Sequence, residues 1–431
     1  MPRETLSEVY FNRRMAVLLG LGFASGLPSA YKLLGSTLQA WLGEFKVDLK
    51  TITLFSIVTL PLGLKFLWAP LMDRFAPRLL PGMGRRRSWL LVVQVLLLLA
   101  IAGMALTGPT RIGQSLWPLA IIAVVVAFLA ASQDIVSDAY RTDVLPDQEL
   151  GAGAAMYVNG YRVAMLVAGG GALLLAGSLH ALGVNQPWRV VYLYLALLMA
   201  VGICSTLLAP EPPHTSPPAS LTEAVVQPAE DFWKRLGWKT VALFALVVLF
   251  KLPDGMAGWV VQPFLQTQLG FDLTTIALAR DGIGMGAAVL GTLAGGALLA
   301  RMRLIPVLLV LGLLQALTNL GYCALAVVLA DADFKLLVVV MIVENFCAGM
   351  AAVGFIALLM SYCSRRYSAT QYALFTSLMF MTTSLVGAPT GWLVEELGYL
   401  QFFMLTIAAG IPGLVLLWFM RDMHAPPKGG G

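Results

Sequence analysis

Residues 116–140 read LWPLAIIAVVVAFLAASQDIVSDAY, an apolar run with two aspartates, Asp134 and Asp138, near its end. A run of about 20 apolar residues crosses a bilayer as a helix. Such runs recur along the chain, which has 431 residues, 59% hydrophobic and only 12% charged. A soluble domain usually carries about 25% charged residues. The composition therefore predicts a polytopic membrane protein and excludes a soluble enzyme, a disordered chain and a secreted disulfide scaffold.

Apolar runs and their breakers extend outward from this segment and predict an all-α protein with twelve transmembrane helices. The expected spans lie near 15–41, 51–72, 88–107, 116–140, 152–179, 187–209, 239–265, 274–299, 304–330, 335–361, 369–394 and 399–420. A Pro-rich polar segment separates the first six from the last six. We expect an N-terminal six-helix bundle over 1–209, a cytoplasmic linker over 210–238 and a C-terminal six-helix bundle over 239–431.

The distribution of basic residues predicts the orientation. With the N-terminus inside the cell, the cytoplasmic segments contain 18 Lys and Arg, and the external segments contain five. This excess follows the positive-inside rule, so both termini are expected in the cytoplasm and the net charge of +5 does not indicate nucleic-acid binding. Three arginines precede the first span without a convincing cleavage site, so no cleaved signal peptide is expected.

The cysteines and histidines do not form a metal-binding pattern. The four cysteines occur singly in apolar segments, and the three histidines fall in loops or in the C-terminal tail. We therefore expect no metal, disulfide or cofactor. The glycines of 282–286 and the pair Gly291 and Gly295 lie in a predicted span with no strand before them, so they predict close helix packing rather than a nucleotide site.

Short sequence matches relate the two halves of the chain. Leu27-Pro28 recurs as Leu252-Pro253, LQxxLG occurs at 38–43 and 265–270, and DLxTI occurs at 48–52 and 272–276. The matches keep their order at a separation of about 225 residues. Six spans return the chain to the cytoplasm, so the repeat is parallel, like that of the two major facilitator halves. Chance agreement between Leu-rich segments is the alternative.

Ten charged residues are predicted to lie inside the membrane. A charge at the bilayer centre costs about 2.5–3.5 kcal/mol on insertion scales and normally faces a partner or a cavity. The set therefore predicts a polar central pathway, with static salt bridges between helices as the alternative. The bases are Lys32, Lys65, Arg162, Lys251 and Arg280, and the acids are Asp134, Asp138, Asp254, Asp281 and Glu344.

Spacing and depth assign roles to these side chains. Asp134, Asp138 and Arg141 share one helix face. The rise of 1.5 Å per residue places Lys65 and Arg162 in the same half of the membrane as Asp134. We expect proton coupling from Asp134, Glu344, Asp254 and Asp138. Amides, aromatic rings and bases suit a hydroxyl-rich, amide-rich and carboxylate-bearing ligand. The expected substrate-binding residues are Lys65, Gln133, Tyr161, Arg162, Lys32, Lys251, Asn345 and Gln371.

The segment after the second span resembles the signature of the major facilitator superfamily. It contains Asp73-Arg74 followed by Gly84-Arg85-Arg86-Arg87, with a longer spacing than usual. The resemblance implies that these residues contact neighbouring helix ends and close the cytoplasmic side. We expect gating roles for Asp73, Arg74 and Arg141.

Longer motifs resemble those of the AmpG muropeptide permease family of Gram-negative bacteria. They are spread over the chain, and the segment 131–146 is highly specific. The motifs are LGFASGLP (21–28), GSTLQAW (35–41), DLKTI (48–52), KFLWAPLMDR (65–74), ASQDIVSDAYRTDVLP (131–146), GAGAAMYVNGYR (151–162), VENFCAGM (343–350) and SATQYALF (368–375).

This resemblance implies import of N-acetylglucosaminyl-1,6-anhydro-N-acetylmuramic acid, free or with its peptide, from the periplasm to the cytoplasm. The proton gradient would drive a monomer in the bacterial inner membrane, and the imported fragments would serve peptidoglycan recycling and β-lactamase induction. The alternatives are a major facilitator transporter of a drug or an acyl-CoA-type amphiphile, a membrane-embedded transferase or hydrolase, and a receptor. No nucleophile constellation in the spans supports the enzyme alternative.

Overall fold

A computed structural model describes residues 12–29, 32–47, 55–77, 83–212, 220–271, 273–328, 334–387 and 389–421. Every regular element in these ranges is a helix, so the predicted all-α class is confirmed. Nine helices of the described ranges are long and apolar enough to cross a membrane. The side chain of Asp281 and the residues Tyr31, Asp48, Lys50, His214, His424 and Lys428 lie outside the description.

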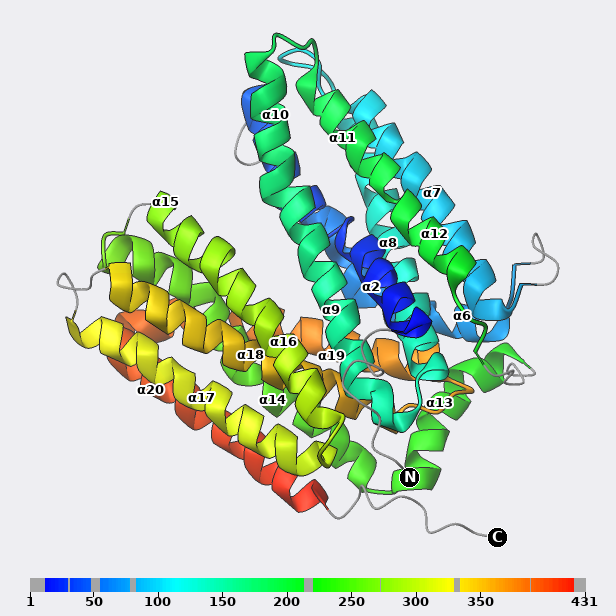
Figure 1. The fold of residues 1–431 in the computed structure, drawn as a ribbon, viewed down its shortest axis with the longest axis vertical. Helices are drawn as coiled ribbons and strands as arrows, with labels where there is room; N and C mark the ends of the chain where they lie inside the picture. The colour runs from blue at the N-terminus through cyan, green and yellow to red at the C-terminus, as the bar shows by residue number, and fades with distance from the viewer. Residues whose placement is uncertain are drawn as a thin grey trace. The chain divides into compact units, whose positions relative to one another are not determined.

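Four long apolar helical stretches lie in the described part of the first half of the chain. Figure 1 shows them in cyan to green. Their segments are α7, α8, α9 with η5 and α10, and α11 with α12. The elements are α2 (Arg13–Gly26), η1 (Lys32–Thr37), α3 (Leu38–Glu44), η2 (Phe55–Thr59), α5 (Leu60–Leu64), η3 (Lys65–Leu67), α6 (Ala69–Arg74), α7 (Arg85–Thr107), α8 (Trp117–Val144), α9 (Leu150–Leu166), η5 (Val167–Gly171), α10 (Ala172–Ala181), α11 (Pro187–Leu198) and α12 (Ala200–Leu208).

The first two predicted spans are divided into short helices. In the span 15–41, α2 ends at Gly26 just before Leu27-Pro28, and the backbone of Gly35 inside η1 is not helical. In the span 51–72, Pro61 and Pro70 stand in the first turns of α5 and α6. Proline has no backbone donor and favours the start of a helix, so these positions begin new segments instead of continuing one span.

The second half contains longer helices that Figure 1 shows in green to red. α17 packs along both α18 and α20, and α14 packs along α20. The elements are α13 (Leu221–Leu236), α14 (Lys239–Pro263), η6 (Phe264–Gln268), α15 (Leu273–Ile276), η7 (Ala277–Gly284), α16 (Met285–Leu299), α17 (Leu304–Val328), α18 (Phe334–Tyr362), α19 (Ser368–Gly387) and α20 (Thr390–Phe419).

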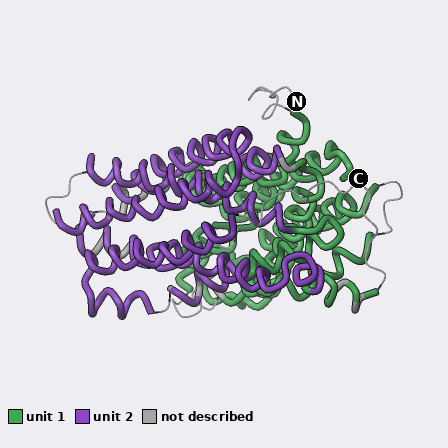
Figure 2. Tube along the Cα trace, turned by 90° about the horizontal axis from the view of Figure 1, so that it is seen from below, with its two compact units in different colours: residues 1–146, 156–229, 363–377 green, residues 147–155, 230–362, 378–431 purple. Residues whose placement is uncertain are grey.

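The chain divides into two compact units, coloured in Figure 2. Unit 1 contains residues 1–146, 156–229 and 363–377, and unit 2 contains 147–155, 230–362 and 378–431. Each unit thus takes a short segment from the other half of the sequence: the start of α19 belongs to unit 1. The predicted domain boundaries at 209 and 239 stay a prediction.

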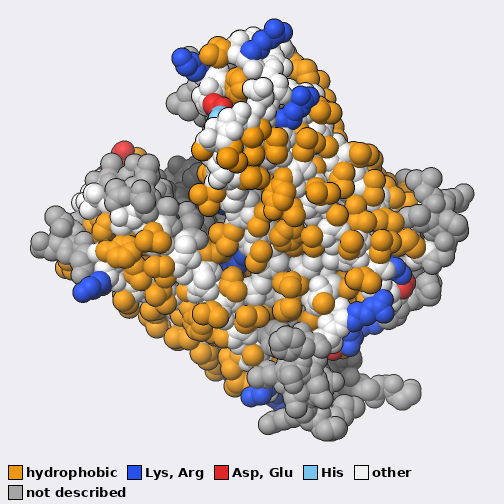
Figure 3. All heavy atoms as spheres, turned by 45° about the horizontal axis from the view of Figure 1, so that its top comes forward, with side chains coloured by type: hydrophobic (Ala, Val, Ile, Leu, Met, Phe, Trp, Pro, Cys, Tyr) orange, Lys and Arg blue, Asp and Glu red, His pale blue; other side chains and the backbone are white. Residues whose placement is uncertain are grey.

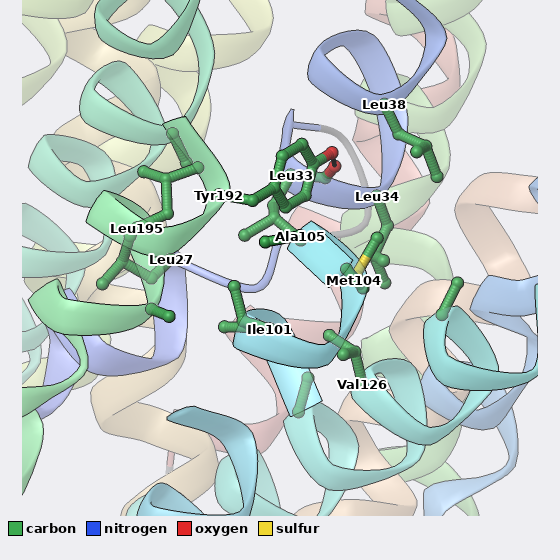
Figure 4. Close-up of a cluster of buried hydrophobic side chains, with 14 of the residues drawn as sticks. Leu27, Leu33, Leu34, Leu38, Ile101, Met104, Ala105, Val126, Tyr192 and Leu195 are labelled. Carbon is green, nitrogen blue, oxygen red and sulfur yellow. Dashed lines mark hydrogen bonds between the residues drawn. The ribbon is translucent and has the colours of Figure 1, made fainter. Parts of the chain in front are cut away.

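Unit 1 has an apolar core between α7, α8, α11 and the first, divided span. Figure 4 shows the side chains of Leu27, Leu33 and Leu34 facing Met104, Tyr192 and their neighbours. The Tyr192 hydroxyl donates to the Leu33 carbonyl at 3.0 Å, which satisfies a buried acceptor beside the break in this span. The core therefore holds η1 in place although its helix is interrupted.

Unit 2 relies on close packing between α16 and α18. A Cβ atom at Gly291 would lie 2.1 Å from the Phe346 carbonyl oxygen, and one at Gly295 would lie 2.8 Å from the Met350 Cα atom. Only glycine permits this approach of two backbones. The predicted packing role of this glycine pair is confirmed.

The predicted linker 210–238 contains a helix, α13. Ser220 and Glu223 provide the reason, because the Ser220 hydroxyl accepts a hydrogen bond from the Glu223 amide at 3.0 Å, as an N-cap residue does. Pro228 and Phe232, four residues apart on one face, are buried, whereas Glu230 and Lys234 are exposed. The segment is therefore an ordered amphipathic helix in its second half.

Apolar side chains cover much of the surface of the described chain. Figure 3 shows hydrophobic side chains over most of the visible face and basic side chains in small groups. Many large apolar residues of α7, α8 and α17 are exposed, as lipid contact requires.

Candidate functional site

A charged network lies within unit 1, where η3 meets α8. The Lys65 Nζ atom lies 3.7 Å from Asp134 Oδ2 and 3.9 Å from Asp138 Oδ2. The Lys65 side chain is 7% exposed, Asp138 is 10% exposed and Asp134 is 22% exposed. The structure thus brings Lys65 close to Asp134, which the sequence predicted to lie in the same half of the membrane, and also to Asp138. Lys65 stands between both carboxylates.

Arg141 extends this network one turn further along α8. It donates a 2.7 Å hydrogen bond to Asp138 and a 2.8 Å hydrogen bond to the Tyr372 hydroxyl at the start of α19. Its guanidinium carbon also lies 4.4 Å from the centre of the Tyr157 ring, a cation–π distance. Asp138 therefore has a tight partner in Arg141, which Asp134 does not share. The two bases and two acids sum to zero charge.

The amide of Gln133 and several hydroxyl groups lie beside this network. Gln133 Nε2 donates to the Ser25 hydroxyl at 3.2 Å, and Ser25 lies 3.5 Å from the Ser137 hydroxyl. The Gln133 side chain is fully buried, and its Oε1 atom has no hydrogen-bond partner among the described residues. A buried acceptor of this kind normally requires a donor. Gln133 therefore has capacity for a further hydrogen bond.

A second ionic network surrounds Asp73, which is fully buried. Arg86 bonds Asp73 and Asp143 at 2.8 Å each, and it donates to the Ser368 hydroxyl at 2.7 Å. Asp73 also accepts from the backbone amide and the hydroxyl of Thr370, both at 2.8 Å. A carboxylate at a helix N-terminus is stabilised by the amides and the dipole of that helix. Asp73 thus holds the first turn of α19.

Arg74 and the arginines of 85–87 make different contacts, and the gating role of Arg74 stays a prediction. The guanidinium carbon of Arg74 lies 5.5 Å from the ring of its neighbour Phe75. Arg85 Nη1 donates to the Asp73 carbonyl at 2.6 Å, and Arg86 Nη2 donates to the Asp73 carboxylate at 2.8 Å. Two arginines of the segment 85–87 therefore contact Asp73.

Unit 2 contains a smaller charged group on α14. Lys251 Nζ bonds Asp254 Oδ2 at 2.8 Å, and Gln315 Nε2 of α17 donates to Asp254 Oδ1 at 2.7 Å. Lys251 also lies 5.9 Å from the centre of the Phe355 ring. Asp254 therefore has two close partners, one of them on its own helix.

The other predicted residues of unit 2 lie on α18 and its neighbours. Asn345 Nδ2 donates to the Met341 carbonyl of its own helix at 2.9 Å. Glu344 and Arg280 both lie within electrostatic range of the buried Tyr322 hydroxyl. The side chains of Glu344, Asn345 and Arg280 are half-buried.

The remaining predicted residues of unit 1 differ in their surroundings. Gln371 is fully buried, accepts from the Ser364 amide at 2.6 Å and donates to the Pro228 carbonyl at 3.1 Å, which favours a structural role. Tyr161 and Arg162 are half-buried on α9. Lys32 is half-buried on η1, at the break in the first span.

Several residues of these networks were not singled out from the sequence, among them Asp143, Tyr157 and Gln315. Asp143 follows Arg141 by two residues, and Gln315 is an amide inside an apolar span, so both offered a signal. Tyr157 offered none, because its contact with Arg141 depends on how α9 packs against α8. In the described part of the chain, no group of three or more His, Cys, Asp or Glu residues has the arrangement of a metal site.

Comparisons with known proteins identify the family of this chain. The model of the Major Facilitator Superfamily matches residues 19–388. The Anhydromuropeptide permease of Escherichia coli K12 is 45% identical over 416 residues, which cover 96% of this chain and 81% of that protein. The Putative transporter AmpG 4 of Rickettsia felis is 31% identical over 96% of this chain and 98% of its own length.

Solved structures share the fold. A proton:xylose symporter, XylE, bound to 6-bromo-6-deoxy-D-glucose matches with a TM-score of 0.67 at 12% identity, covering 96% of each chain. The transporter FucP in the outward conformation matches with a TM-score of 0.66 at 11% identity, covering 94% of this chain and 98% of its own. The major facilitator fold predicted from the sequence is therefore confirmed.

Proposed function

Because the chain belongs to the AmpG muropeptide permease family of the major facilitator superfamily, we propose that it imports anhydro-muropeptides by proton symport. The chain is a multi-pass membrane transporter and not an enzyme. The proposed cargo is N-acetylglucosaminyl-1,6-anhydro-N-acetylmuramic acid, free or with its peptide. The proposed direction is from the periplasm to the cytoplasm, where the fragments enter peptidoglycan recycling.

The observation that carries the proton coupling is the charge-neutral network of Lys65, Asp134, Asp138 and Arg141. Asp138 is held by Arg141 at 2.7 Å, whereas Asp134 is more exposed and faces Lys65 at 3.7 Å. A proton on Asp134 leaves the network with one net positive charge and releases Lys65. An anionic substrate restores neutrality, so proton and substrate bind together more favourably than either alone.

The polar groups around this network suit the proposed substrate. The sugar carries two acetamides and several hydroxyls, and the free Gln133 Oε1 acceptor fits an N–H or O–H donor. Tyr161, Arg162 and Asn345 are the half-buried residues that we propose for further contacts. The peptide, or the lactyl group of the free sugar, supplies the carboxylate.

The proposed site of action is the bacterial inner membrane, with both termini in the cytoplasm and the chain working as a monomer. The excess of Lys and Arg in the predicted cytoplasmic segments supports this orientation. Cysteines introduced near either terminus should react with an impermeant thiol reagent only after the cytoplasmic face is opened.

Uptake in proteoliposomes tests the function. With an inward proton gradient, the purified protein should accumulate labelled anhydro-muropeptide, and an uncoupler should abolish the accumulation. Unlabelled anhydro-muropeptide should compete, whereas an acyl-CoA or a typical efflux drug should not. Absence of accumulation under a maintained gradient would overturn the proposal. Accumulation that survives the uncoupler would retain the substrate but refute proton symport.

A further inference from the structure

Two irregular segments of unit 1, the kinked η1 and the π-helical η5, pack against each other. η1 contacts η5, and the Thr37 hydroxyl of η1 donates to the Ala168 carbonyl of η5 at 2.5 Å. A π-helical turn such as that of η5 occurs often at a functional site. The Thr37 hydroxyl links the kinked segment to the backbone of this turn. The two irregular segments are thus joined at a fixed position.

The side chain of Lys32 passes from η1 over Gly169 of η5, which has no side chain of its own. A Cβ atom at Gly169 would lie 2.8 Å from Lys32 Cδ and 3.4 Å from Cε. The aliphatic stem of Lys32 therefore occupies the space that any larger residue at position 169 would fill. A Cβ at the adjacent Gly170 would meet nothing within 4 Å. The glycine at 169 positions Lys32, and the one at 170 does not.

The ammonium of Lys32 differs from those of the other intramembrane lysines. Lys65 lies within 4 Å of two carboxylates, and Lys251 bonds Asp254 at 2.8 Å. Lys32 has no carboxylate or other side-chain partner among the residues described. A membrane-embedded cation is costly unless it has a partner, so such a residue indicates a site for an anion.

We propose that Lys32 binds a carboxylate of the transported molecule and makes the transporter select anionic muropeptides over neutral ones. This inference rests on the proposed function and names the chemical group that this part of the site recognises. The carboxylate is the C-terminal one of the peptide, or the lactyl one where no peptide is attached. Thr37 and Gly169 position the ammonium of Lys32. Lys65, within 4 Å of Asp134 and Asp138, belongs to the proton-coupling network instead.

Uptake of two matched probes tests this assignment. One is the labelled anhydro-disaccharide tripeptide, and the other is the same compound with its carboxylates converted to amides. The wild type should transport the acid with a KM at least about tenfold lower than the amide, as a charge-assisted contact predicts. Lys32→Gln should raise the KM of the acid to that of the amide and leave the amide unchanged. Lys32→Arg should retain part of the preference.

Gly169→Ala should weaken the preference by displacing the Lys32 stem, and Gly170→Ala should leave it intact. Lys335→Gln, which removes an exposed lysine, is the charge control. Equal transport of acid and amide by the wild type would overturn the proposal. An equal loss for both probes in Lys32→Gln would also overturn it. If the wild type transports neither probe, the proposed function itself fails, which is a different result.

Discussion

The charged groups of the two units are built in different ways. In unit 2, Lys251 and Asp254 lie three residues apart on α14 and bond at 2.8 Å, so their pair forms wherever that helix forms. In unit 1, Lys65 comes from η3, the acids come from α8, and Tyr372 comes from α19. This network exists only when the three segments are assembled. A local pair stabilises a helix, whereas an assembled network responds to movement between helices.

The distances support the same distinction. Lys65 stands 3.7 Å and 3.9 Å from two carboxylates, outside hydrogen-bonding range of either one. Asp254 accepts two bonds of 2.8 Å and 2.7 Å. A shared, looser ion pair changes partners at a smaller cost than a pair with two tight bonds. We therefore assign the proton-dependent change to unit 1 and a supporting role to the pair of unit 2.

The largest expected effect comes from removal of Arg141. Arg141→Ala leaves the buried Asp138 carboxylate without its 2.7 Å partner, and breaking a buried ion pair in this way costs about 3–5 kcal/mol. Lys251→Ala removes one member of a more exposed pair, for which the expected loss is about 1 kcal/mol or less. Thermal unfolding of the purified proteins in one detergent should rank them in this order.

A double variant distinguishes two contributions to the loss of stability: the unpaired buried charge and the lost side-chain packing. Arg141→Met combined with Asp138→Leu removes both charges and keeps similar volume, so it should recover much of the stability lost in Arg141→Ala. If Arg141→Ala and Lys251→Ala lower the unfolding temperature equally, the contrast between the units is wrong.

A second prediction compares one carboxylate from each unit. Asp134→Asn cannot exchange a proton, so accumulation driven by the proton gradient should fall to simple equilibration. Exchange of labelled for unlabelled muropeptide should continue, because that reaction needs no net proton movement. Asp254→Asn should keep gradient-driven accumulation, since its amide still accepts from Gln315. Accumulation by Asp134→Asn, or equilibration only by Asp254→Asn, would reverse the assignment of the units.

The sequence was sufficient for the fold and for part of the network. Hydropathy, the order of breakers and the repeat predict the all-helical architecture, and helical spacing places Asp134, Asp138 and Arg141 on one face. Spacing also predicted that Lys65 and Asp134 lie in the same half of the membrane, and the two side chains are 3.7 Å apart. These inferences use only the geometry of single helices.

Contacts that depend on packing were beyond sequence reasoning. The bonds of Gln371 with the Ser364 amide and the Pro228 carbonyl were not foreseen, and its substrate contact stays a prediction. The pairing of Arg86 with Asp73 and Asp143 was not foreseen either. The exact partner of a polar side chain depends on rotation of one helix about another, which hydropathy does not report.

The smallest expected effect comes from the hydroxyl of Tyr372. Tyr372→Phe removes a 2.8 Å hydrogen bond to Arg141 and keeps the ring, so the cation–π contact at 5.2 Å and the bond to Asp138 remain. A hydrogen bond to a charged group contributes about 1.5–3 kcal/mol, and the retained contacts place the expected loss near the lower end, about 1.5 kcal/mol.

Tyr192→Phe is the matched control, because that buried hydroxyl bonds a neutral carbonyl at 3.0 Å. Its expected loss of stability is about 1 kcal/mol, and transport should not change. Tyr372→Phe should additionally alter the dependence of uptake on external pH, since Arg141 then interacts more with Asp138 and less with α19. If the two variants behave alike in transport, Tyr372 stabilises the fold but does not link α19 to the network.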